Sequence, residues 1–260
     1  MSGLVHFKLE RQDAVARVTI DRPRSMNTMT KEVWEEMDVL LRELEGDFET
    51  RCVVLTGAGK NFSAGIDLSV LGQVDSGFIA RNLSWLQGLN NRWENLNQPV
   101  IAAVNGVCFG AGVELILACD VRIAASDASF SIPEVQFGLS PDMGGSQRLA
   151  RLVGIGQAKR LILGCERIDA GEALRIGLVE EVVEPDQLLV RAEGLARRIA
   201  GMPPMSVKFA KKAVNLADQS SLYAGLLYEQ AQSVFCCGTE DKNEAVAAFF
   251  EKRKPVFKGK

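Results

Sequence analysis

Two short apolar runs, each followed directly by a glycine-rich turn, place the strongest constraint on the fold of this 260-residue chain. The run Cys52–Leu55 ends at Thr56-Gly57, and the run Val100–Val104 ends at Asn105-Gly106. Apolar runs without polar alternation are typical of parallel strands that are buried on both faces of a sheet. The sequence therefore predicts an α/β fold in which helices cover both faces of a parallel sheet.

The remaining segments favour the same class of fold. Leu4–Leu9 and Val15–Ile20 predict a β-hairpin, and Lys31–Leu44 predicts a helix because its apolar residues recur at helical spacing. Further helices are predicted over Arg81–Leu96 and Val113–Ala118, and further strands over Val121–Ala125 and Ser129–Ile132. From about Gly144 onward the pattern is almost entirely helical. We therefore expect an α/β core over residues 1–195 and a helical C-terminal region over residues 196–260.

The composition argues against several classes of function. The 30 basic and 33 acidic residues give a net charge of −3, which is no signature of a nucleic-acid-binding protein. No apolar run approaches the roughly 20 residues of a membrane span, and the amino terminus resembles neither a signal nor a transit peptide. The six cysteines have no metal-ligand spacing. We expect a cytoplasmic protein with reduced thiols, no metal site, and neither nucleic acid nor membrane as a partner.

The chain has one histidine, His6, which lies close to the amino terminus. Serine and cysteine triads and His-rich zinc sites would all depend on that residue. A residue so close to a terminus is more often structural than catalytic. Acid–base chemistry is therefore expected from carboxylates, and stabilisation of negative charge from backbone groups.

The glycine-rich turns are candidates for a binding site made of main-chain atoms. Gly65 in the first turn and Gly110 and Gly112 in the second would let a ligand approach backbone N–H groups closely. The dinucleotide motif does not match because Phe62 stands where it needs glycine, and the P-loop motif does not match because Asn61 follows Lys60 and Val54 stands at its first glycine position. Two such turns facing each other would form an oxyanion hole. Tight turns without a ligand are an alternative that the glycines alone leave open.

Three carboxylates follow the second turn. Glu114 is in the first turn of the predicted helix, Glu134 follows Pro133, and Asp142 lies eight residues further on. An acidic residue in a first helical turn often only complements the helix dipole. Taken singly, each of the three is more often structural than catalytic, and their spacing does not show that they converge.

Several motifs occur in order along nearly the whole chain. They are Asp21–Asn27, Asn61–Leu68, Pro99–Gly106, Gly110–Leu115, Gly144–Leu149 and Phe249–Lys254. In this combination the chain resembles the enoyl-CoA hydratase/isomerase (crotonase) superfamily. The resemblance implies a crotonase-like spiral of ββα turns with a helical C-terminal layer. It also implies a homotrimer or homohexamer, with residues 196–260 as the trimerisation region.

The resemblance also implies site residues. The two oxyanion-hole donors fall on the backbone N–H groups of Ile66 and Ala111, although many members have glycine at the second position. The positions that bind coenzyme A match Met26, Ala64, Ile66, Asp67 and Leu68, with Phe249 and Lys252 at the nucleotide end, often from a neighbouring subunit. Coenzyme A belongs to the acyl-CoA thioester substrate, so no separate cofactor is implied.

The mechanism implied by the resemblance depends on the acids. Hydratases of this superfamily carry two glutamates twenty residues apart, and Glu114 and Glu134 have that spacing. Glu114 would orient and deprotonate water for attack at C3, and protonated Glu134 would deliver a proton to C2. The expected activity is reversible hydration of 2-trans-enoyl-CoA thioesters.

Two alternatives stay open. Many hydratases have glycine where this chain has Asp142, and dienoyl-CoA isomerases carry a catalytic aspartate there. A dienoyl-CoA or Δ3–Δ2 enoyl-CoA isomerase using Glu134 and Asp142 is therefore one alternative. A non-catalytic or RNA-binding homologue is the other, and it would use Lys211-Lys212 and the basic C-terminus. The balanced charge of the chain argues against RNA binding.

Overall fold

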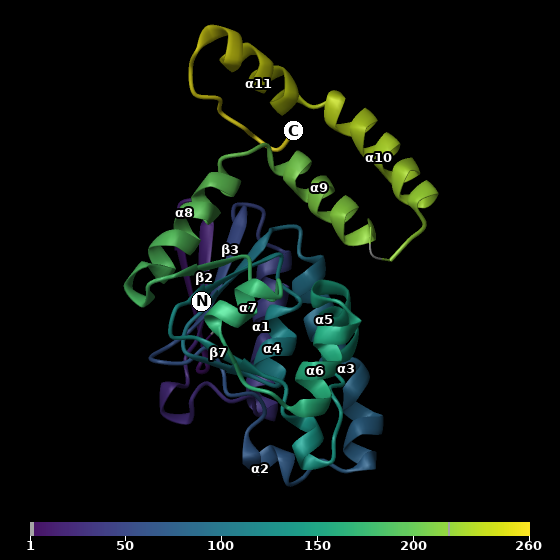
Figure 1. Ribbon diagram of the computed structural model, residues 1–260. Helices are drawn as coiled ribbons and strands as arrows, with labels where there is room; N and C mark the ends of the chain where they lie inside the picture. The colour runs from purple at the N-terminus through teal and green to yellow at the C-terminus, as the bar shows by residue number, and fades with distance from the viewer. Residues whose placement is uncertain (1–2, 218) are drawn as a thin grey trace.

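The structure, a computed structural model, describes residues 3–217 and 219–260 and contains two sheets with helices around them (Figure 1). The larger sheet has the strand order β1-β2-β3-β4-β6-β9 and is parallel except for the β1–β2 hairpin. Its strands are β1 (Phe7–Gln12), β2 (Val15–Ile20), β3 (Cys52–Gly57), β4 (Val100–Val104), β6 (Val121–Ala125) and β9 (Glu181–Val183). The smaller sheet contains β5 (Val107–Phe109), β7 (Ser129–Ser131) and β8 (Ile168–Asp169).

The helices fall into those that surround the sheets and those that follow them. The first group is α1 (Lys31–Glu45), α2 (Leu68–Leu71), α3 (Ser76–Asn95), α4 (Ala111–Ile116), α5 (Gly145–Val153), α6 (Ile155–Gly164), α7 (Ala170–Arg175) and α8 (Leu188–Ala200). The second group is α9 (Pro204–Ala217), α10 (Leu222–Cys237) and α11 (Glu240–Glu251). Short 3₁₀ helices are η1 (Pro23–Ser25), η2 (Glu134–Phe137) and η3 (Pro185–Gln187).

The central strands are buried on both faces. In β3, Val53 and Leu55 pack into the cluster that contains α1, α3 and α4, whereas Cys52 and Val54 pack against α8. β3 and β4 pair in parallel. The prediction that these two apolar runs are parallel strands buried on both faces is confirmed, as is the α/β class with a helical C-terminal layer.

The C-terminal helices form an arm. Figure 1 shows α9, α10 and α11 extending away from the sheets, while α8 lies against the larger sheet. The predicted boundary after residue 195 falls inside α8, whose Ala192, Ala196 and Ala200 belong to the buried core. None of the described helices is long and apolar enough to cross a membrane.

Three strands were not predicted, α4 begins and ends two residues before the predicted Val113–Ala118, and the start of α3 was predicted five residues too late. β5, β8 and β9 have only two or three residues each and pair with strands far along the chain, so no local periodicity marks them. The almost entirely helical pattern predicted after Gly144 therefore lacked the short strands β8 and β9. Helix α3 begins at Ser76 rather than Arg81, because Asp75 caps it by accepting a hydrogen bond from the Phe78 N–H.

A buried ion pair fastens the arm to the core. The ammonium group of Lys211, on α9, donates to Asp120 Oδ2 at 2.8 Å and to the Gln98 carbonyl at 3.1 Å. The same Asp120 oxygen accepts the N–H of Val100, the first residue of β4. Lys211 is only 8% exposed. The pair therefore holds the first helix of the arm against the start of a central strand.

Replacing Lys211 by methionine is expected to lower the free energy of unfolding by about 3 kcal/mol, because Asp120, whose side chain is only 19% exposed, then loses its counter-charge. The measurement is urea denaturation of the variant and its parent. Lys212→Met is the matched control on the same helix and should cost much less. Adding Asp120→Asn to Lys211→Met should restore part of the loss. Equal stability of the two single variants would contradict this role of the ion pair.

Candidate active site

The two glycine-rich turns lie side by side. The N–H of Ser63 donates to the Val107 carbonyl at 3.0 Å, and the N–H of Phe109 donates back to the Ser63 carbonyl at 2.9 Å. Gly65 then adopts φ +90°, where a Cβ would lie 2.8 Å from the Phe109 carbonyl oxygen. The absence of a side chain at Gly65 therefore allows the two backbones to come together.

The backbone N–H groups of Ile66 and Ala111 lie next to this contact. A Cβ on Gly65 would be 3.5 Å from the Ala111 nitrogen. The N–H of Met29 donates to the Gly65 carbonyl, and the Met29 carbonyl accepts the N–H of Asp67. The N–H of Ile66 lies between these two hydrogen bonds and takes part in neither. Within the described part of the chain, neither the Ile66 N–H nor the Ala111 N–H donates a hydrogen bond. Two unsatisfied donors from separate turns can both bind one oxygen atom.

Glu114 lies in the first turn of α4 and is only 2% exposed. Its Oε1 accepts the N–H groups of Met143 at 2.9 Å and Gly145 at 2.8 Å. The pKa of Glu114 is raised to about 7, chiefly by burial and also by the charges of Glu134 and Asp142, against the two N–H groups, which lower it. This carboxyl group therefore titrates near neutral pH, as a general base requires.

Glu134 begins η2 and lies over Gly110. A Cβ on Gly110 would be 2.9 Å from Glu134 Oε1, so a side chain there would displace the carboxyl group from its place at the start of α4. The other oxygen, Oε2, is buried and accepts no hydrogen bond from the described residues. Burial, and the charge of Asp142, raise the pKa of Glu134. Both effects favour a protonated carboxyl group.

Asp142 lies in the turn before α5 and is half-buried. Burial raises its pKa, and its charge acts on both Glu114 and Glu134. The structure therefore brings the three carboxylates together from α4, η2 and the turn before α5. The spacing of the sequence did not show this convergence.

The residues expected at the coenzyme A site are grouped beside the first turn. Ala64 donates its N–H to the Met26 carbonyl at 3.0 Å, and Met26 has an exposed side chain. Asp67 accepts hydrogen bonds from the hydroxyl groups of Ser69 and Thr28, which lower its pKa, and Leu68 begins α2 with an exposed side chain.

Phe249 and Lys252 are not brought to this site within one chain. Both lie at the end of α11, and Phe249 is 79% exposed. In Figure 1, α11 and α2 lie at opposite ends of the molecule.

Sequence reasoning missed two polar residues of α3 that contact the turn before α5. Asn90 donates to the Met143 carbonyl at 2.9 Å, and Gln87 donates to the Asp142 carbonyl at 2.7 Å. Asn90 stands among the buried residues Leu86, Leu89 and Trp93 of the same helix. A polar residue on an apolar helix face was the available signal.

Comparison with known proteins agrees with this geometry. The family model described as enoyl-CoA hydratase/isomerase matches residues 10–260. The chain is similar to a short-chain-enoyl-CoA hydratase of Clostridium acetobutylicum, with 44% identity covering 95% of each chain. It is also similar to a crotonyl-CoA hydratase of Syntrophomonas wolfei, with 39% identity covering 96% of each chain. The crystal structure of an enoyl-CoA hydratase from Bacillus anthracis superposes with a TM-score of 0.95 at 38% identity, covering 98% of this chain and 100% of that one. The chain therefore has the crotonase fold and belongs to the enoyl-CoA hydratase/isomerase family.

Proposed function

We propose that the protein adds water reversibly to 2-trans-enoyl-CoA thioesters. The observation that carries the proposal is the convergence of Glu114, Glu134 and Asp142 beside the unsatisfied N–H groups of Ile66 and Ala111. Relatives similar over their whole length are named as short-chain-enoyl-CoA and crotonyl-CoA hydratases, so short unbranched thioesters are the first substrates to test.

The N–H groups of Ile66 and Ala111 would bind the thioester carbonyl oxygen. Attack of water at C3 moves negative charge onto that oxygen, giving an enolate-like transition state. Donors already in place stabilise this charge without reorganising, and one such donor is typically worth about 10²–10³-fold in rate.

The two glutamates would divide the acid and base roles. Two N–H groups on one oxygen of Glu114 favour its ionised form, which would accept a proton from the attacking water. Glu134 has a buried oxygen without a donor, which favours its protonated form, and it would deliver that proton to C2. Because the charges of the acids act on one another, their apparent pKa values belong to the set rather than to single residues.

The charge of Asp142 supports a second candidate, double-bond migration in dienoyl-CoA or 3-enoyl-CoA. A third carboxylate beside Glu134 would be able to take a proton from one carbon while Glu134 supplies one to another. Product identification separates the two candidates. With 2-trans-enoyl-CoA and 3,5-dienoyl-CoA supplied separately, hydration yields 3-hydroxyacyl-CoA, whereas isomerisation yields a shifted diene of unchanged mass.

Replacing Asp142 by asparagine is expected to leave hydration within about tenfold of the parent rate and to lower any dienoyl isomerisation by about 10²-fold or more. Losing a negative charge lowers the pKa of Glu114, so the acid limb of the kcat/KM profile should move to lower pH. The measurement is the pH dependence of both reactions. If Asp142→Asn abolishes proton transfer while Glu114→Gln has a mild effect, isomerisation replaces hydration as the main activity.

The RNA-binding alternative loses one of its two features. Lys211 is buried and paired with Asp120, so Lys211-Lys212 is not an exposed basic patch.

We further propose that the arm mediates assembly into homotrimers or homohexamers, which would bring Phe249 and Lys252 to the nucleotide end of a neighbouring site. Exposed apolar residues on the arm, such as Leu222, Val234 and Phe250, support this proposal, and light scattering would test it. A cytoplasmic location stays a prediction.

A further inference from the structure

The turn that holds Glu114 has no backbone hydrogen bond between its own described residues. It comprises residues 142–145, and two of its N–H groups, those of Met143 and Gly145, bind the same carboxylate oxygen. Gly144 has φ +110°, and a Cβ on Gly145 would lie 2.8 Å from Glu114 Oε1. The direction of the two N–H groups therefore depends on how the rest of the protein fixes this turn.

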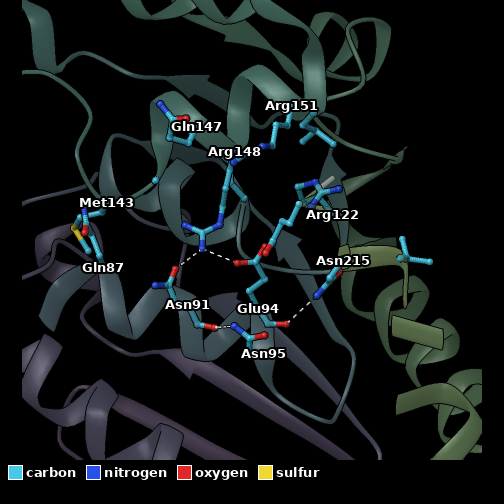
Figure 2. Close-up of a pocket in the computed structure, with 15 residues that line it drawn as sticks. Gln87, Asn91, Glu94, Asn95, Arg122, Met143, Gln147, Arg148, Arg151 and Asn215 are labelled. Atoms are coloured by element: carbon cyan, nitrogen blue, oxygen red, sulfur yellow. Dashed lines mark hydrogen bonds and ion pairs between the residues drawn. The ribbon is translucent and has the colours of Figure 1, made fainter. Parts of the chain in front are cut away.

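Helix α3 fixes the turn from outside through side-chain amides. Asn90 Nδ2 donates to the Met143 carbonyl at 2.9 Å, and Gln87 Nε2 donates to the Asp142 carbonyl at 2.7 Å. Figure 2 shows Gln87 beside Met143 at one end of a cavity of about 890 Å³ between α3, α5 and α9. Asn90 is only 2% exposed, so its amide has little access to water as an alternative partner.

An arginine holds the other side of the turn. Arg148, on α5, donates to Asn91 Oδ1 at 2.7 Å and to Glu94 Oε2 at 2.6 Å, as the dashed lines in Figure 2 show. Its guanidinium group lies over Gly144, where a Cβ would be 2.2 Å from Nη1. Helix α3 is thus joined both to the turn and to the helix that follows it.

We propose that Asn90 is a positioning residue, whose amide holds the 142–145 turn so that the Met143 and Gly145 N–H groups fix the carboxylate of Glu114. Asn90 touches neither substrate nor reacting atoms in this scheme and acts through the turn. Gln87 contributes in the same way, from the helix surface. The proposal rests on the proposed role of Glu114 as the base.

Loss of the Asn90 hydrogen bond is expected to shift the pKa of Glu114 in one direction. The Met143 and Gly145 N–H groups stabilise ionised Glu114, so a loosened turn raises its pKa. The charged groups that act on Glu114, Glu134 from η2 and Asp142 from the turn, remain in an Asn90 variant. The acid limb of kcat/KM should therefore move to higher pH, opposite to the shift expected for Asp142→Asn.

For Asn90→Ala, we expect kcat to fall about tenfold or more with KM within about twofold, because the base is misplaced while the CoA contacts are kept. The acid limb should rise by about half a pH unit or more. Asn95→Ala is the matched control, since Asn95 donates to the Asn91 carbonyl within α3 and does not contact the turn. It should match the parent in rate and profile. Circular dichroism and thermal unfolding would establish that each variant is folded.

Gln87→Ala keeps the test decisive if Asn90→Ala does not fold, because Gln87 is exposed and should move the acid limb in the same direction by a smaller amount. A second readout does not depend on turnover: ¹³C NMR titration of the Glu114 carboxyl, assigned with Glu114→Gln. A parent that does not hydrate would overturn the proposed function and leave this titration measurable. A folded variant with an unmoved acid limb and an unmoved Glu114 titration would overturn the role of Asn90.

Discussion

Replacing Glu114 by glutamine is expected to lower kcat for hydration by about 10²–10⁴-fold. Glutamine has the same shape, and its carbonyl oxygen can still accept the Met143 and Gly145 N–H groups that hold Glu114. The fold and the affinity for coenzyme A should therefore be kept, and only the proton acceptor is lost. The measurement is single-turnover hydration together with calorimetric titration of the CoA product.

The same substitution should stabilise the protein at alkaline pH. The folded pKa of Glu114, about 7, lies above the ordinary value of 4.5, so its ionisation opposes folding. The stability that this group supplies is complete below pH 4.5 and is lost as the pH rises through 7. At pH 8, the Glu114→Gln variant should unfold with a free energy about 3 kcal/mol higher than the parent, and at pH 4.5 with little difference.

Urea denaturation at the two pH values gives the comparison. A folded Glu114→Gln variant that hydrates at the parent rate would remove Glu114 from the mechanism. An equal gain in stability at both pH values would show instead that the gain does not come from ionisation of this carboxyl group.

Replacing Gly65 by alanine is expected to lower kcat/KM by about 10²-fold or more, because it separates the two donors of the proposed oxyanion hole. The added Cβ would lie 2.8 Å from the Phe109 carbonyl oxygen, so the turns that carry Ile66 and Ala111 must move apart. Steady-state kinetics with crotonyl-CoA measures the effect.

Gly154→Ala is the matched control for backbone strain. Gly154 has φ +82°, close to the +90° of Gly65, and a Cβ there would meet no atom within 4 Å. Both variants should lose stability from the positive φ, and Gly65→Ala should lose more because its Cβ also meets the Phe109 carbonyl oxygen, but only Gly65→Ala should lose activity. Similar kinetics for the two variants would contradict the placement of the oxyanion hole.

Elements with strong local signals could be predicted from the sequence. β3 and β4 were found because their apolar runs need no partner to be recognised, and α1 because its apolar stripe spans a whole helix. β8 and β9 exist only through pairing with β7 and β6, so two or three residues carry no signal of their own.

The residues of the candidate site could be predicted from the sequence, but their arrangement could not. Gly65, Gly110 and the three acids were singled out from their residue types, but their convergence depends on how α4, η2 and the 142–145 turn pack together. The unsatisfied oxygen of Glu134 and the two donors on Glu114 are tertiary features, and they support the proposed roles of Glu134 as the acid and Glu114 as the base. The resemblance implied the two roles, but these hydrogen-bonding environments depend on tertiary packing that the sequence does not show.

In the proposed reaction, two main-chain N–H groups and two glutamates add water across the double bond of an enoyl thioester. Incubation with crotonyl-CoA in H₂¹⁸O, followed by mass spectrometry of the CoA products, tests this reaction. We expect 3-hydroxybutyryl-CoA with ¹⁸O at C3, formed by the parent and almost absent with Glu114→Gln. An unlabelled product of unchanged mass with a moved double bond, or no conversion by the folded parent, would contradict it.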